Sequence, residues 1–135
     1  MFDCQVNNQL TPAIREKVLN RVNELRSTLA LGNAEALNGK APQGSNIRKL
    51  VGIISVRIFF QRDCCLQKRQ LAWATSTKIG CGFISGCTGN VPLIVVCRLK
   101  SFSGNMVTGQ IYKPGTPCSN CPSGTTCSPS VGLCE

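Results

Sequence analysis

The sequence predicts an α+β fold, with one domain at residues 1–114 and a cysteine-rich tail at residues 115–135. Three features predict it: an amphipathic stretch of helical period near the N-terminus, two apolar stretches rich in β-branched residues, and the loss of any hydrophobic period after Pro114. At 135 residues the chain is long enough for one hydrophobic core and too short for a second catalytic domain.

Residues 11–31 are expected to form the helix. Thr11 can cap its N-terminus, Pro12 suits its first turn, and Gly32 with Asn33 ends it. Its apolar residues recur at helical spacing and predict one buried stripe: Ile14, Val18, Val22, Leu25 and Leu29. Its charged residues lie off that stripe and are expected to face solvent: Arg15, Arg21, Glu24 and Arg26.

The strands are expected in later stretches. Residues 51–60, VGIISVRIFF, are rich in β-branched and aromatic residues and predict a strand if a partner strand is available. Residues 71–83 are expected to run from a helix end or turn into a strand, and the nearly unbroken apolar run at 91–99 is typical of a buried strand. Residues 105–115 are expected to close the core.

The inventory of catalytic side chains argues against an enzyme. The sequence contains no histidine, which excludes Ser-His-Asp and Cys-His catalysis and any zinc site that needs imidazole. The six carboxylates are scattered singly, so a paired-carboxylate hydrolase is not expected either. We therefore predict no catalytic residue, no metal ligand and no cofactor.

The net charge of +9 arises from fifteen lysines and arginines spread along the chain. Such a surface could attract anionic glycans or acidic lipid headgroups by salt-sensitive forces. Nucleic acid is not expected as a partner, because the chain has few aromatic residues and none interleaved with basic ones for bases to stack on.

The cysteine count indicates an oxidising compartment. Ten cysteines form an even number, far above cytosolic usage, so the protein is expected to be secreted and extracellular. The chain begins without the basic start and apolar run of a signal peptide, so either a leader has been removed from this numbering or the chain is an incomplete gene product. The cysteines favour the removed leader. No apolar run is long enough to span a bilayer.

The tail CSNCPSGTTCSPSVGLCE, residues 118–135, holds four of the ten cysteines. A zinc site would require two closely spaced pairs. Cys118 and Cys121 form one, but Cys127 and Cys134 are too far apart for the second. Disulfides are therefore the favoured interpretation, and they would staple a segment that lacks a core of its own.

Several motifs in sequence order resemble the CAP superfamily (SCP/TAPS). They are VNELRS at 22–27, NGKAP and SNIRKL within 38–50, AWATSTKIGCG at 72–82, VVCRLKSFSGNM at 95–106, and QIY at 110–112 before the tail cysteines. The resemblance is nearest to the secreted activation-associated, venom-allergen-like proteins of parasitic nematodes. It implies an α-β-α sandwich followed by a cysteine-rich hinge-like tail.

The resemblance does not extend over residues 51–69, which stand where the family has a second helix and inner strands. The chain therefore resembles a truncated CAP domain with its central region missing. The family's metal-holding cavity includes a histidine before the AWAT block, but Gln67 stands at that position and Arg69 replaces the motif's Thr, while Gln70 matches. The metal function is not carried over.

For the tail, the resemblance implies two overlapping bridges, Cys118 with Cys127 and Cys121 with Cys134. The other six cysteines are expected to form three more bridges, and fifteen connectivities are open. These six are Cys4, Cys64, Cys65, Cys81, Cys87 and Cys97.

The preferred functional interpretation follows from the resemblance: a secreted, non-enzymatic protein that binds host proteins or lipids and is immunomodulatory. Two alternatives stay open. One is a small cysteine-rich protease inhibitor or toxin-like module centred on the tail. The other is a nonfunctional truncated isoform, since a layered fold cannot readily lose elements from its middle.

Overall fold

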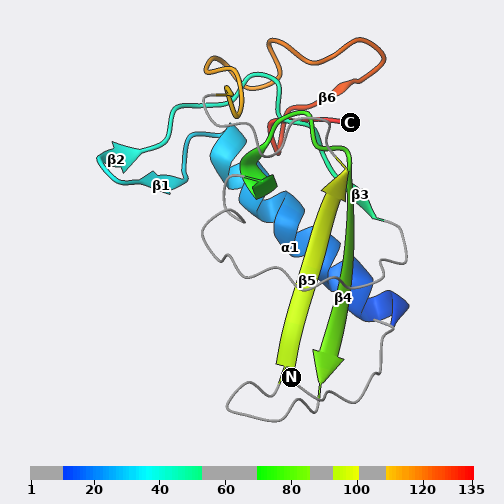
Figure 1. The fold of residues 1–135 in the computed structure, drawn as a ribbon. Coiled ribbons are helices and arrows are strands. Elements are labelled where there is room, and N and C mark those ends of the chain that lie inside the picture. Colours follow the sequence, from blue (N-terminus) through cyan, green and yellow to red (C-terminus); the bar gives the residue numbers. More distant parts are fainter. Residues whose placement is uncertain (1–10, 53–69, 86–92, 101–108) are drawn as a thin grey trace.

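One long helix and a three-stranded sheet form the frame of the molecule (Figure 1). The computed structural model describes residues 11–52, 70–85, 93–100 and 109–135, with the side chains of 83–85 and 93–96 left out. Helix α1 spans Pro12–Ala30, and the sheet contains β3 (Val51–Gly52), β4 (Lys78–Ser85) and β5 (Leu93–Lys100). Two short hairpins complete the fold, β1 (Glu35–Ala36) with β2 (Gly39–Lys40) and β6 (Cys127–Ser128) with β7 (Leu133–Cys134).

Helix α1 begins and ends where the sequence predicts. The Thr11 side-chain oxygen accepts a hydrogen bond from the Ile14 backbone N–H at 3.4 Å, and Pro12 occupies the first turn. After the helix, Gly32 adopts a left-handed conformation with φ of +72°, which glycine reaches without strain. The cap and the terminating glycine therefore set both ends of the helix.

The predicted buried stripe is wrong in part. Ile14 and Leu25 are 44% and 45% exposed, whereas the fully covered positions are Val22, Arg26 and Ala30. These three positions are four residues apart, so the ridge that faces the rest of the molecule follows an i, i+4 row of the helix. Leu25 lies about 100° around the helix from Arg26 and points away from that ridge.

The sheet has the order β3-β4-β5, with β3 parallel to β4 and β4 antiparallel to β5. The long hairpin confirms the two strands expected from residues 71–83 and 91–99, and a helical turn at 70–72 precedes β4 as expected. Of the strand predicted at 51–60, Val51–Gly52 is observed, and the remainder lies outside the described residues.

Strand alternation separates two faces of the sheet. Ile79 pairs with Leu99 and Cys81 with Cys97, so these four side chains share one face. That face packs against Val22 of α1 and Leu50 in one apolar cluster. A second cluster joins Ala30 at the end of α1 to Ile47, Ala74 and Leu133.

The cysteine-rich tail contributes to this core. Leu133 and Cys134 are each 1% exposed, and Cys134 donates its N–H to the Ile47 carbonyl while Lys49 donates to the Cys134 carbonyl. The tail was expected to lack a core of its own, but part of it is buried against α1 and residues 47–49. The division at residue 114 stays a prediction.

Candidate functional site

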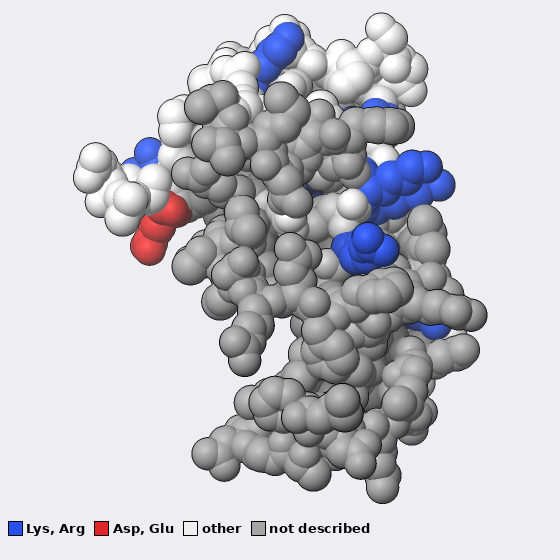
Figure 2. Space-filling view, viewed as in Figure 1, with Lys and Arg blue, Asp and Glu red and all other residues white. Residues whose placement is uncertain are grey.

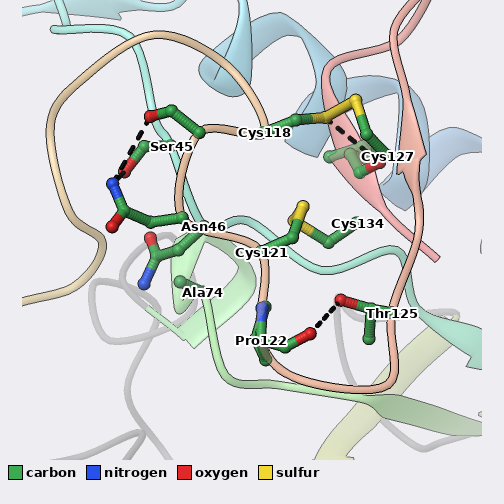
Figure 3. The surroundings of a disulfide bond; sticks show 12 residues. Ser45, Asn46, Ala74, Cys118, Cys121, Pro122, Thr125, Cys127 and Cys134 are labelled. Carbon is green, nitrogen blue, oxygen red and sulfur yellow. Dashed lines mark hydrogen bonds between the residues drawn. A yellow bond between two sulfur atoms is a disulfide. The ribbon is translucent and has the colours of Figure 1, made fainter.

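Two disulfides shape the tail (Figure 3). Cys118 is bonded to Cys127, and Cys121 to Cys134. These are the pairs that the resemblance implies. Cys127 and Cys134 face each other across the β6–β7 hairpin, yet each is bonded to a cysteine outside it. The two bridges therefore overlap in sequence and tie the preceding loop to both strands of the hairpin.

Hydrogen bonds dock the stapled loop onto residues 43–49. The Ser45 side chain is fully buried, donates to the Lys113 carbonyl at 3.0 Å and accepts from the Asn120 side-chain amide at 3.2 Å. Gly115 donates its N–H to the Gln43 carbonyl at 2.9 Å. Because the docking bonds involve the backbone of both segments, the tail is held in one orientation.

A metal is the alternative use for these sulfurs. The Sγ atoms of Cys118, Cys121 and Cys134 lie within 4.8 Å of one another. Zinc requires thiolates or other anionic or nitrogen ligands, and all three sulfurs are engaged in disulfides. The proximity is explained by two neighbouring bridges, so the donor set does not fit a metal ion.

A third disulfide joins Cys81 and Cys97 across β4 and β5, on the face that packs against α1. These are two of the six cysteines whose pairing the sequence leaves open. The other four, Cys4, Cys64, Cys65 and Cys87, lie outside the described residues, as do Gln67 and Arg69 of the cavity motif. Gln70 begins the described part of the helical turn before Trp73.

Arg26 was expected to face solvent, and this expectation is wrong. The residue is 1% exposed, and its guanidinium donates hydrogen bonds to four backbone carbonyls, those of Arg48, Leu71, Trp73 and Ala74. Three of these carbonyls belong to residues at and just after the helical turn at 70–72. Those of Trp73 and Ala74 also accept a backbone N–H, from Ser76 and Arg48 respectively. Arg26 adds a donor to each of the three and links α1 to two other segments.

Arg26 remains positively charged at neutral pH although it is buried. Desolvation lowers the pKa of the guanidinium to about 10, which is still well above neutral pH. Five N–H donors in a planar fork match a set of converging carbonyls, and no other side chain has this geometry. A signal was present in the sequence: Val18, Val22, Arg26 and Ala30 form one i, i+4 row, so Arg26 lies between residues that are buried.

The opposite face of the sheet is basic. Lys78 lies directly across from Lys100, and Arg98 lies two residues before Lys100 on the same strand, so all three side chains share the face that points away from α1. All three are exposed. We call Lys78, Arg98 and Lys100 the basic row. Figure 2 shows several groups of blue Lys and Arg atoms on the side of the molecule where Figure 1 places β3 and the arrow end of β5.

In the described part of the chain, the carboxylates that form ion pairs do so with cations outside the basic row. The ion pairs found there join Arg21 to Glu24 and Lys49 to Glu135. The hydrogen bond from the Lys49 side chain, at 2.9 Å, holds the pKa of Glu135 below its usual value. Neither pair includes a residue of the basic row.

Comparison with known proteins gives sequence relatives for about half of the chain. It is 36% identical over 67 residues to the cysteine-rich venom protein of Tityus serrulatus, a match that covers 49% of this chain and 17% of that protein. It is 42% identical over 66 residues to the Ancylostoma secreted protein of Ancylostoma caninum, covering 49% and 15%. It is 40% identical over 77 residues to human peptidase inhibitor 16, covering 53% and 16%. The matched segment thus spans less than a fifth of each of these relatives.

Solved structures share the fold over nearly the whole chain. BmVAL-1 superposes with a TM-score of 0.74 at 22% identity, covering 98% of both chains. Na-ASP-1 gives a TM-score of 0.73 at 22% identity, covering 98% of this chain and 49% of its own. No protein-family model matches the sequence. At this identity the structures establish the fold, and the α+β prediction with a disulfide-rich C-terminal region is confirmed.

Proposed function

The chain carries the CAP-type fold and, over about half its length, resembles secreted and venom-allergen-like CAP proteins in sequence; from this premise we propose that it is a secreted, non-enzymatic binding protein. Its targets are host proteins or lipids, and its action on the host is immunomodulatory. It acts through a rigid surface and turns over no substrate.

The observation that supports this proposal most strongly is that disulfide bonds cross-link the fold. Three disulfides link β4 to β5 and fasten the tail, while the sequence offers no histidine for acid–base chemistry. A surface held in one shape loses little conformational entropy on binding, which favours recognition. The disulfides and the lack of histidine thus suit a binding protein better than an enzyme.

The same disulfides support an extracellular location, because such bonds persist in oxidising compartments. Within the described residues, no helix combines the length and apolar character needed to cross a bilayer. One solved neighbour is described as NaASP2 with Zn2+. We propose that this chain acts without zinc, since it has no imidazole and its clustered sulfurs are joined in disulfides.

A binding assay tests the proposal. The secreted chain, labelled at its N-terminus, would be titrated onto vertebrate host cells and onto lipid vesicles, with a reduced and alkylated sample as the control. We expect saturable binding that excess unlabelled chain displaces and that reduction abolishes. Protease treatment of the cells would separate a protein target from a lipid one. Absence of saturable binding to both cells and vesicles would refute the proposed function.

The inhibitor or toxin-like alternative keeps one point in its favour, the name of the relative peptidase inhibitor 16. It requires the tail to act by itself. Leu133 and Cys134 are buried against the domain, so an isolated tail would expose them to water. An oxidised peptide of residues 114–135 that retained the activity of the full chain would favour this alternative over ours.

A further inference from the structure

The basic row consists of three cations on neighbouring strands, and within the part of the chain that the structure describes, no packing contact requires it. Lys78 and Lys100 are register partners, which places their Cα atoms about 5 Å apart. Arg98 lies about 7 Å before Lys100 along β5, opposite Gly80, which has no side chain to cover the guanidinium. The three heads therefore form a short, open strip along the sheet.

This arrangement has an energetic cost for the free protein. Like charges directly opposite each other on antiparallel strands are destabilising, and the Lys78–Lys100 pair is of this kind. Within the described residues, no ion pair joins a carboxylate to any member of the row. An anion bound along the strip would remove this repulsion, so binding and stability are coupled here.

The surroundings of the row distinguish between anionic partners. Three cations attract acidic lipid headgroups only weakly, and firm membrane binding adds an apolar face that inserts beside them. Among the described residues, the large apolar side chain exposed next to the row is that of Val51 in β3, while Ile14, Leu25 and Leu37 lie on α1 and in the β1–β2 turn. A linear polyanion needs no apolar insertion, and both ammonium and guanidinium groups bind sulfate and carboxylate oxygens, with Arg able to do so through two hydrogen bonds.

We propose that the basic row binds sulfated, linear polysaccharides at the extracellular surface. The strip offers successive cations to successive anionic groups of one glycan chain. This inference rests on the proposed function, because such glycans are met only outside the cell. It names one target class and the residues that would contact it.

Heparin is the probe for the test, with salt elution from a heparin column and titration by calorimetry as measurements. The test variant combines Lys78→Gln, Arg98→Gln and Lys100→Gln. A matched control combines Lys17→Gln, Lys40→Gln and Lys113→Gln, which are exposed and scattered over α1, β2 and the tail junction. Each triple variant lowers the net charge from +9 to +6.

We expect the test variant to bind heparin at least about tenfold more weakly than the parent chain at physiological ionic strength, and the control to change by less than about threefold. A charge-preserving variant, Lys78→Arg, Arg98→Lys and Lys100→Arg, should retain binding. Heparin should also raise the melting temperature of the parent chain and not that of the test variant.

Three outcomes would overturn the proposal. The parent chain could elute no later than a neutral protein, the two triple variants could weaken equally, or vesicles with acidic headgroups could bind the row more tightly than heparin. Heparin lyase treatment of host cells separates this inference from the proposed function. If saturable cell binding survives removal of the glycans, the glycan inference fails and the binding function stands; if heparin binds but cells do not, the proposed function fails.

Discussion

Arg26 is the residue on which three segments of the chain converge. Its guanidinium hydrogen bonds to the carbonyls of Arg48, Leu71, Trp73 and Ala74, and burial excludes water from the contact. In this environment a carbonyl without a donor costs free energy, because water cannot replace the lost partner. The side chain therefore fixes the position of α1 relative to the turn before β4.

Replacement of this side chain should be among the most destabilising single changes. Arg26→Met keeps much of the volume but removes a charged donor from four buried carbonyls, of which those of Trp73 and Ala74 keep a backbone N–H donor. We expect a loss of about 3 to 5 kcal/mol in the free energy of unfolding. Arg21→Met is the control: it removes an exposed ion pair with Glu24 and should cost less than about 1 kcal/mol. Urea denaturation with intact disulfides measures both. Equal midpoints for the two variants would contradict the role given to Arg26.

The hydrophobic pattern gave a signal that Arg26 is buried but did not identify its hydrogen-bond partners. Sequence reasoning treats a charged residue as solvent-facing because few charges are buried. The i, i+4 row through Val18, Val22 and Ala30 pointed inward, but the compensating carbonyls belong to segments 22 to 48 residues further along the chain. Only the folded backbone brings them to the helix.

Among the elements, the β6–β7 hairpin is held both by disulfide bonds and by packing against the core. Cys134 is bonded to Cys121, is 1% exposed and exchanges backbone hydrogen bonds with residues 47–49, whereas Cys127 of the other bridge is exposed. The bridge that ends in the core restrains more of the native structure than the bridge that ends at the surface.

The two tail bridges should therefore differ in their effect on stability. Cys121→Ala with Cys134→Ala should cost about 3 to 5 kcal/mol, since it removes a cross-link and leaves a buried gap, and Cys118→Ala with Cys127→Ala about 2 to 3 kcal/mol. Thermal unfolding of the two double variants compares them. A larger loss for the Cys118–Cys127 pair would show that burial of Cys134 adds nothing.

The long β4–β5 hairpin was predicted well because strand propensity and period-two patterning are local signals. The paired strands also carry the motifs that indicated the family, KIGCG in β4 and VVCRL in β5. Helix α1 was located from its cap and its terminating glycine. The side chains that it buries were predicted less well, since the buried face depends on its partner.

For the whole molecule, the question is whether the tail unfolds with the domain. Leu133 of the tail packs with Ala30, Ile47 and Ala74, which lie within the stretch 1–114 that the sequence predicts to be a domain. This shared cluster couples the two parts. We therefore propose that residues 1–114 and 115–135 form one cooperative unit, despite the change in composition at Pro114.

Leu133→Ala tests this coupling through the single tryptophan. Trp73 is 5% exposed and lies in the domain, so its fluorescence reports on the domain and not on the tail. We expect Leu133→Ala to lower the free energy of unfolding that Trp73 fluorescence reports by about 2 to 4 kcal/mol. Ser130→Ala, a change at an exposed residue, is the near-neutral control. An unchanged Trp73 transition would mean that the tail is an independent module.

The count of free thiols tests the integrity of the whole chain. Six cysteines are paired in the described residues, and the even total of ten predicts that the remaining four pair as well. Thiol-blocking reagent on the unfolded, unreduced protein should leave the intact mass unchanged. Several reactive thiols with scattered masses would favour the nonfunctional truncated isoform over a functional binding protein.

The sequence by itself determined the α+β class, the ends of α1, the β4–β5 hairpin and the CAP resemblance, because caps, periodicity and motif order are local properties of the chain. It also determined that histidine chemistry is absent. Tertiary structure alone decided the burial of Arg26, the face on which the basic row is displayed and the contribution of the tail to the core. Each of these depends on contacts between residues distant in sequence, whose partners no local pattern specifies.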